Sequence, residues 1–154
     1  MPYKILFVCL GNICRSPAAE GIMKHMVAQA GREEEFYIDS AGIGPWHVGE
    51  LPDERMRRTA RQHGYELNSR GRQVKAYDFD DFDLILCMDR GNYDRLMDLA
   101  PTIGAQKKIQ LLGDYLPDGL RTDEIPDPYY GGQQGFDRVI ALIEQACRQL
   151  LETH

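Results

Sequence analysis

The residues best suited to chemistry lie close together near the N-terminus. Residues 8 to 20 read VCLGNICRSPAAE, so that Cys9, Cys14 and Arg15 share one short stretch. A cysteine thiolate is a strong nucleophile, and a guanidinium can bind two phosphate oxygens at once. A cysteine followed after five residues by Arg-Ser-Pro therefore predicts a nucleophile that faces a bound oxyanion.

The loop between Cys9 and Arg15 has the composition of an anion-binding turn. Between a buried strand and a helix N-terminus, consecutive backbone N–H groups can converge on one point, with the helix dipole behind them. Gly11 relieves steric limits in such a turn, and Asn12 tolerates left-handed backbone geometry. The helix terminus and the arginine favour the thiolate form of Cys9, and Ser16 is placed to donate a hydrogen bond to the sulfur.

Each of these residues also has an ordinary structural interpretation. Cys9 alone could end a buried strand as a small hydrophobe, and Arg15 alone could be a surface residue. Their spacing in a strand-to-helix context favours the functional interpretation. A nucleotide-binding P-loop would need a lysine after its glycines, and a zinc site would need paired cysteines or clustered histidines. The sequence has neither pattern.

A candidate proton donor stands on a long loop nearer the C-terminus. Residues 116 to 134 are rich in proline and glycine, and long loops inside compact domains are usually functional or disordered. Within DPYYGG, Asp127 lies between two prolines. Like charge from a bound phosphate and from the Cys9 thiolate would keep this carboxyl protonated, so that it can act as general acid and then as base toward water. Alternatively, Asp127 is an ordinary turn residue.

The apolar pattern predicts the scaffold that positions these residues. Buried strands are expected at residues 4–9, 35–43, 83–88 and 107–112. Helices are expected at residues 17–31, 52–63, 90–100 and 136–151, with Ser16 as the cap of the first. Strands that alternate with helices predict a doubly wound, mostly parallel α/β sheet, in which ligands bind beyond the carboxyl ends of the strands. The loop after Cys9 occupies such a position.

Length, charge and cysteine content bound the class of protein. A chain of 154 residues fits one domain, which is expected to cover residues 1–154. The formal net charge of −6 disfavours nucleic acid as a partner, and no apolar run is long enough to span a membrane. Since no secretion signal precedes the first strand, a cytoplasmic location with reduced cysteines is expected.

Three motifs together resemble one protein family. VCLGNICRSPAAE, CMD at residues 87 to 89 and DPYYGG at residues 127 to 132 look like the low-molecular-weight protein tyrosine phosphatases, in order and spacing, over essentially the whole chain. The resemblance implies a flavodoxin-like fold, with a four-stranded parallel sheet flanked by helices on both faces. It also implies no metal or other cofactor, and hydrolysis of phosphotyrosine and aryl phosphates through a cysteinyl-phosphate intermediate. The implied partners are tyrosine-phosphorylated proteins, with phosphate or another oxyanion in the active site.

The resemblance further implies roles for individual residues. Cys9 matches the nucleophile, Arg15 the phosphate clamp and Asp127 the general acid. The residues that match the phosphate loop and the support of the thiolate are Leu10, Gly11, Asn12, Ile13, Cys14 and Ser16. Those that match the pocket rim include Trp46, Tyr129 and Tyr130. Cys14 also matches a second cysteine that forms a reversible disulfide with Cys9 under oxidant and so protects it from irreversible oxidation.

Some other residues have two interpretations or an expected structural role. Asp89 could hold the arginine of the loop from below, or it could cap the helix that follows. Cys87 ends a strand and Cys147 lies on an apolar helix stripe, so both are expected to be buried and unreactive. The histidines are expected to be structural or surface residues; they are His25, His47, His63 and His154.

Three other functions stay open at this point. A thioredoxin-coupled arsenate reductase shares this fold and a similar loop; Cys87 could serve in its cysteine relay, but Asp94 stands where the other relay cysteine is expected. A phosphoarginine phosphatase tends to carry threonine in place of Ile13, whose apolar side chain instead favours an aryl ester. A phosphotyrosine-binding module would need neither Cys9 nor Asp127.

Overall fold

A parallel sheet forms the centre of the molecule. The computed structural model describes residues 1–130 and 132–154, except for the side chain of Tyr130. The strands are β1 (Tyr3–Cys9), β2 (Phe36–Gly42), β3 (Leu84–Cys87) and β4 (Ile109–Leu111). They form one four-stranded sheet in the order β2-β1-β3-β4, and every pair is parallel. The expected sheet is therefore confirmed.

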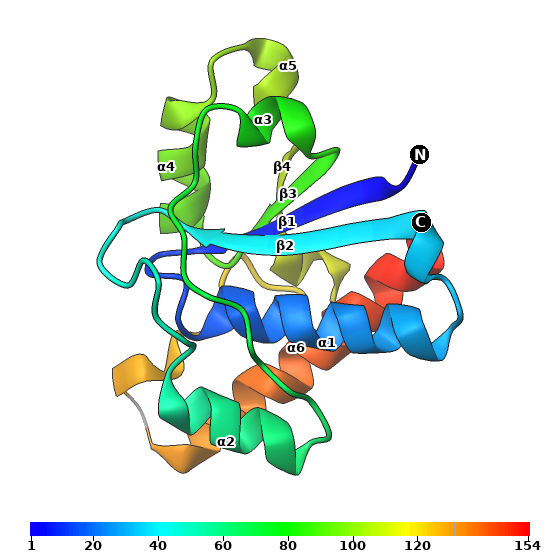
Figure 1. The fold of residues 1–154 in the computed structure, drawn as a ribbon, viewed down its shortest axis with the longest axis vertical. Helices are drawn as coiled ribbons and strands as arrows, with labels where there is room; N and C mark the ends of the chain where they lie inside the picture. The colour runs from blue at the N-terminus through cyan, green and yellow to red at the C-terminus, as the bar shows by residue number, and fades with distance from the viewer. Residues whose placement is uncertain (131) are drawn as a thin grey trace.

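Helices cover both faces of this sheet (Figure 1). One layer contains α1 (Arg15–Gln29), α2 (Glu54–Gln62) and α6 (Gln133–Thr153), and the other contains α3 (Asp78–Asp81), α4 (Arg90–Leu99) and α5 (Ile103–Gln106). The 3-10 turns are Glu33–Glu35, Leu112–Tyr115 and Pro128–Tyr130. Within the part of the chain that the structure describes, no helix has the length and apolarity needed to cross a membrane.

The central strand β1 explains why its sequence is continuously apolar. Ile5 and Phe7 belong to the hydrophobic core under α1 and α6, whereas Leu6 and Val8 belong to the core under α4. Since successive side chains of a strand point to opposite faces, a strand covered on both faces needs apolar residues throughout. The sheet thus separates two cores and holds the end of β1 rigidly between its neighbours.

The carboxyl ends of β1 and β2 bring two loops into close contact. Cys9 lies opposite Gly42 in the strand register. A side chain at Gly42 would approach the carbonyl carbon of Gly11 to 3.0 Å and the backbone nitrogen of Asn12 to 3.1 Å. Glycine is needed here because the loop after β1 folds back against the end of β2.

The start of α1 differs from the sequence expectation. The helix begins at Arg15 with Cys14 as its N-cap, and the Cys14 side chain makes no capping hydrogen bond. The prediction that Ser16 caps this helix is therefore wrong. Ser16 is the second helical residue, and its hydroxyl is directed toward Cys9 and Asn12. Pro17 is tolerated at the next position because the first N–H groups of a helix have no intrahelical partner.

Candidate active site

A pocket of about 300 Å³ opens at the carboxyl edge of the sheet. It collects side chains from three distant segments: the loop after β1, the loop after β2, and the segment before α6. The lining residues are Cys9, Leu10, Gly11, Ile13, Cys14, Arg15, Trp46, His47, Asp127 and Tyr129. Most of the sequence-predicted site residues therefore lie together, while the side chain of Tyr130 falls outside the described residues.

The sulfur of Cys9 is held by donors from the first turn of α1. Its Sγ lies 3.0 Å from the Ser16 hydroxyl oxygen, and it accepts the backbone N–H of Ser16 at 3.4 Å. Cys9 is almost fully buried but lines the pocket. The Ser16 N–H and the N-terminus of α1 place positive ends of dipoles at the sulfur, and the Ser16 hydroxyl can donate to it as well, which favours negative charge on the sulfur.

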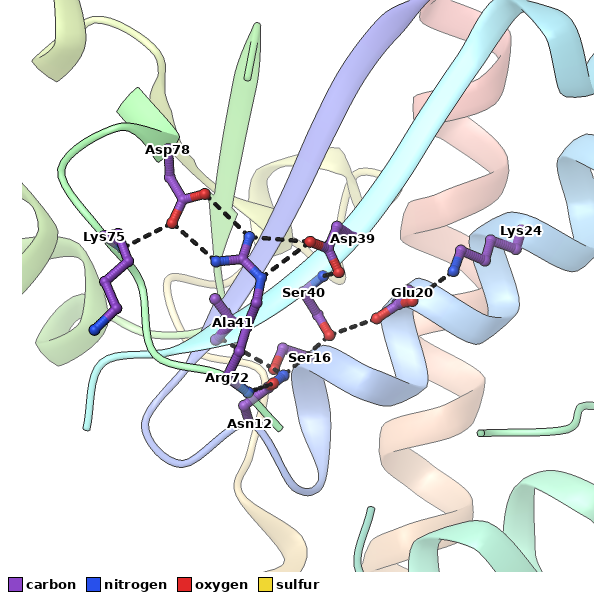
Figure 2. A network of polar contacts seen from close by, with 10 residues as sticks. All are labelled: Asn12, Ser16, Glu20, Lys24, Asp39, Ser40, Ala41, Arg72, Lys75 and Asp78. Atoms are coloured by element: carbon purple, nitrogen blue, oxygen red, sulfur yellow. Dashed lines mark hydrogen bonds and ion pairs between the residues drawn. The ribbon is translucent and has the colours of Figure 1, made fainter. Parts of the chain in front are cut away.

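The phosphate loop, defined here as residues 10–15, is shaped by Asn12. This residue has φ +58°, the one positive φ outside glycine in the described parts of the chain. Its Nδ2 donates to the hydroxyl oxygens of Ser16 at 2.7 Å and Ser40 at 3.0 Å (Figure 2). Its Oδ1 accepts the backbone N–H of Arg72 at 3.1 Å. Because Asn12 donates to the Ser16 oxygen, the proton of that hydroxyl has two acceptors within reach, the Cys9 sulfur at 3.0 Å and the carbonyl oxygen of Ala41 at 3.5 Å, and the sulfur is the nearer of the two.

Arg15 is anchored from behind so that its guanidinium faces the pocket. Its side chain donates to Asp89 Oδ2 at 2.8 Å and to the carbonyl oxygen of Ile125 at 2.9 Å. Burial acts to lower the Arg15 pKa, but the charges of Cys9, Asp89 and Asp127 outweigh it and raise the pKa. The guanidinium is therefore a permanent positive charge beside the sulfur.

Asp89 fulfils both of the roles considered for it. Its Oδ2 accepts from Arg15, and its Oδ1 accepts the backbone N–H of Asn92 at 2.7 Å as the N-cap of α4. The two alternatives were not exclusive because a carboxylate has two oxygens.

Asp127 lines the pocket from the segment before α6. Its Oδ2 lies 3.6 Å from the Arg15 guanidinium, and its Oδ1 accepts the backbone N–H of Tyr129 at 3.0 Å. The side chain is 39% exposed, so water can reach it. A carboxyl in this position can donate a proton to a group leaving the pocket.

The segment that carries Asp127 is attached to α2 through Arg55. The Arg55 guanidinium donates to the carbonyl oxygen of Tyr129 at 2.8 Å. It also lies 5.3 Å from the centre of the Tyr129 ring and 4.8 Å from that of Phe136, and it pairs with Asp53. Sequence reasoning missed Arg55 because Tyr129 and Phe136, which it contacts beside the pocket, are more than seventy positions away.

The rim of the pocket is apolar and aromatic. Trp46 is 62% exposed, and its ring packs on Gly44, where any side chain would meet the ring at 2.0 Å. Leu10 is also exposed, and Ile13 and Tyr129 are half-buried. These side chains form walls that suit a flat ring rather than a polar chain.

His47 is a pocket residue that sequence reasoning left among the structural histidines. Its ring lies against Gly11, since a Cβ there would come within 3.1 Å of its Cδ2, and its Nδ1 lies 3.2 Å from Glu50 Oε2. His47 is partly exposed and paired with Glu50, which fits the expected surface or structural role, but that expectation did not place it at the pocket. The available signal was its place directly after Trp46 in a glycine-rich and proline-containing loop.

The other cysteines differ from Cys9 in their surroundings. Cys14 is buried but lines the pocket, and burial together with the charges of Asp53, Cys9 and Asp127 raises its pKa, so that it is a neutral thiol. Burial raises the pKa of Cys87 to about 12 and also raises that of Cys147, as expected for unreactive core thiols. No three His, Cys, Asp or Glu side chains of the described residues are grouped as metal ligands.

A buried sulfur, a fixed guanidinium and an exposed carboxyl around one small pocket are the groups needed for displacement at phosphorus. The fold and this arrangement define a class of cysteine-dependent phosphate hydrolases. The comparisons with known proteins agree with that class. Residues 4–154 match the family described as low molecular weight phosphotyrosine protein phosphatase.

Individual relatives align along nearly the full chain. A putative low molecular weight protein-tyrosine-phosphatase of Synechocystis is 48% identical over 148 residues, covering 96% of this chain and 94% of the relative. The crystal structure of a protein tyrosine phosphatase from Entamoeba histolytica, with Hepes in its active site, has a TM-score of 0.94 and 44% identity, covering 98% of this chain and 96% of that one. A Drosophila arginine phosphatase has a TM-score of 0.90 and 40% identity, covering 97% and 96%. The chain belongs to the low molecular weight phosphotyrosine protein phosphatase family, whose members are hydrolases.

Proposed function

We propose that this protein removes phosphate from phosphotyrosine in proteins and from other aryl phosphates, with Cys9 as nucleophile. The observation that carries the proposal is the Cys9 sulfur, 3.0 Å from the Ser16 hydroxyl, in a pocket that is also lined by Arg15 and Asp127. The arrangement supports the proposal because a phosphate group bound in this pocket would lie within reach of all three side chains.

In the first step, phosphate oxygens bind the backbone N–H groups of the phosphate loop and the guanidinium of Arg15. The Cys9 thiolate forms a bond to phosphorus while the bond from phosphorus to the phenolic oxygen breaks. Asp127 gives its proton to that oxygen, so that the phenol leaves neutral and the enzyme holds an S-phosphocysteine.

In the second step, the Asp127 carboxylate accepts a proton from water as the water oxygen bonds to phosphorus. The bond from sulfur to phosphorus breaks, and inorganic phosphate leaves. The Ser16 hydroxyl donates to the departing sulfur and stabilises its returning negative charge, for which the 3.0 Å contact is already in place. Asp127 is then protonated again and the cycle is complete.

The substrate preference rests on the walls of the pocket. Leu10, Ile13 and Trp46 present apolar surface around the opening, which favours a phenyl ring over a guanidinium. A phosphoarginine phosphatase is the second candidate because a Drosophila arginine phosphatase is 40% identical. An arsenate reductase is the third candidate. Its cysteine relay would need a second cysteine near Cys9, but Cys87 is buried and does not line the pocket.

Parallel kinetics on the three substrates distinguish these functions. We expect kcat/KM for a phosphotyrosine peptide to exceed that for phosphoarginine by at least about tenfold, because an apolar wall leaves a guanidinium unpaired. Thioredoxin-dependent reduction of arsenate should be at background. A preference for phosphoarginine or a thioredoxin-dependent turnover would assign the protein to the corresponding alternative.

We further propose that Cys14 protects Cys9 by forming a reversible disulfide. Cys14 lines the same pocket and its raised pKa keeps it a thiol, so that Cys9 is the first of the two to be oxidised. After peroxide, mass mapping should find a Cys9 to Cys14 linkage, and dithiothreitol should restore activity. The Cys14→Ser variant should instead lose activity irreversibly as Cys9 becomes sulfinic acid. Finding both thiols free in oxidised wild-type protein would reject this role.

The proposed partners and location follow from the same chemistry. Tyrosine-phosphorylated proteins are the proposed substrates, and the net charge of −6 does not suit nucleic acid. A cytoplasmic location is proposed because a thiol nucleophile requires a reducing compartment.

A further inference from the structure

The orientation of Asn12 depends on a donor from outside the phosphate loop. An amide side chain can present either its oxygen or its nitrogen to the same neighbour. Here the Arg72 N–H contacts Asn12 Oδ1, which directs Nδ2 to the Ser16 and Ser40 hydroxyls. If the amide were reversed, its oxygen would accept the Ser16 proton, and that proton would no longer be available to Cys9.

The segment around Arg72 is joined to the edge of the sheet by its backbone. The Arg72 carbonyl accepts the N–H of Gly42 at 2.8 Å, and Gln73 pairs with Gly42 as an isolated bridge. These bonds bring the segment to the end of β2, but they leave the Arg72 N–H free to bond Asn12.

The Arg72 side chain holds the same segment in place through ion pairs with two carboxylates (Figure 2). Its guanidinium donates to both carboxylate oxygens of Asp78 at 3.0 Å, and its Nε donates to Asp39 at 3.0 Å. Asp78 is 1% exposed and also accepts the backbone N–H of Lys75 at 2.7 Å. A bidentate pair with a buried carboxylate limits both the position and the rotation of the guanidinium. Asp39 belongs to β2 and Asp78 to α3, so the arginine links two rigid elements.

We propose that Arg72 is a positioning residue for the thiolate of Cys9. Its ion pairs with Asp39 and Asp78 hold its backbone N–H at Asn12 Oδ1, and Asn12 in turn leaves the Ser16 proton directed at the sulfur. The inference deepens the function proposed above, on which it rests for the role of Cys9. It adds a residue that touches neither substrate nor sulfur.

The experiment measures how readily Cys9 is ionised, without using any substrate. The rate at which iodoacetamide alkylates Cys9 is followed against pH, with the site of alkylation mapped by mass spectrometry. In Arg72→Gln, the rate at about pH 5.5 should fall about fivefold, because one hydrogen bond to the thiolate is weakened. At about pH 10, where free thiols are ionised, the variant and the wild type should react alike.

Three further variants separate positioning from general damage. Arg72→Lys keeps one charged contact to Asp78 and should lie between wild type and Arg72→Gln. The double variant Arg72→Gln/Asp78→Asn avoids an unpaired buried carboxylate, so it tests the same loss in a more stable fold. Arg61→Gln removes an exposed ion pair with Glu66 and should match wild type.

Unchanged alkylation profiles in Arg72→Lys and in the double variant would overturn the proposal, as would an equal loss of rate at both pH values. Should Arg72→Gln fail to fold, the alkylation profiles of these two variants test the proposal in its place. The outcome is independent of the proposed phosphatase activity, because wild-type protein inactive on aryl phosphates would refute that function and leave the alkylation comparison intact.

Discussion

Replacing Cys9 by serine should abolish hydrolysis of p-nitrophenyl phosphate, with a loss of at least about ten-thousandfold in kcat, because a serine hydroxyl at this site has no base to ionise it. Binding of inorganic phosphate should persist. The loop amides and Arg15 remain, and Arg15 stays anchored by Asp89 and Ile125. Steady-state assays and calorimetric titration with phosphate measure the two effects separately.

Cys87→Ser is the matched control for this substitution. Cys87 ends the neighbouring strand β3, and its sulfur contacts the carbonyl oxygen of Gln110, a bond that a serine hydroxyl can keep. This variant should retain activity close to wild type. Full activity in Cys9→Ser, or a comparable loss in Cys87→Ser, would refute the assignment of Cys9 as the nucleophile.

Replacing Asp127 should have an effect that grows with the basicity of the leaving group. A phenolate with a high pKa needs a proton as it leaves, whereas p-nitrophenolate does not. We expect Asp127→Ala to lower kcat/KM for phenyl phosphate by about a hundredfold to a thousandfold, and for p-nitrophenyl phosphate by about tenfold or less. Kinetics on a series of substituted aryl phosphates measure this slope.

Two additional variants test whether the loss of activity comes from the missing proton donor or from a disturbed loop. Asp127→Asn can still accept the backbone N–H of Tyr129 but cannot donate an acidic proton, so it should behave like Asp127→Ala. Asp123→Ala removes an exposed acid from the same segment and should leave the slope unchanged. An equal loss on good and poor leaving groups in both Asp127 variants would exclude Asp127 as general acid.

The fold was predictable where the local sequence and the tertiary environment favour the same secondary structure. The continuous apolar run that ends at Cys9 requires a strand covered on both faces, and β1 is such a strand. The expected strand at 107–112 is reduced to Ile109–Leu111, since only these three residues pair with β3 and the chain continues from Leu112 as a 3-10 turn. Ser16 was misassigned as a cap because its alternative partners, Cys9 and Asn12, become neighbours only after the loop has folded.

The sequence predicted which residues lie at the centre of the candidate site, but not the residues that hold them in position. Cys9 and Arg15 lie on one turn, so their spacing in sequence is already their spacing in space. Arg55, Arg72 and His47 contact segments far from them in the chain, and their types alone indicate ordinary surface residues. Long-range backbone contacts of this kind leave no spacing pattern in one sequence.

The most direct test of the account is to trap the covalent intermediate. Enzyme mixed with an aryl phosphate carrying labelled phosphorus is quenched within the first turnover, digested and mapped. We predict labelled phosphate bound to the sulfur of Cys9 in wild-type protein, and none in Cys9→Ser. Label on another residue, or complete turnover without any labelled protein at the earliest times, would contradict a mechanism that passes through phosphocysteine.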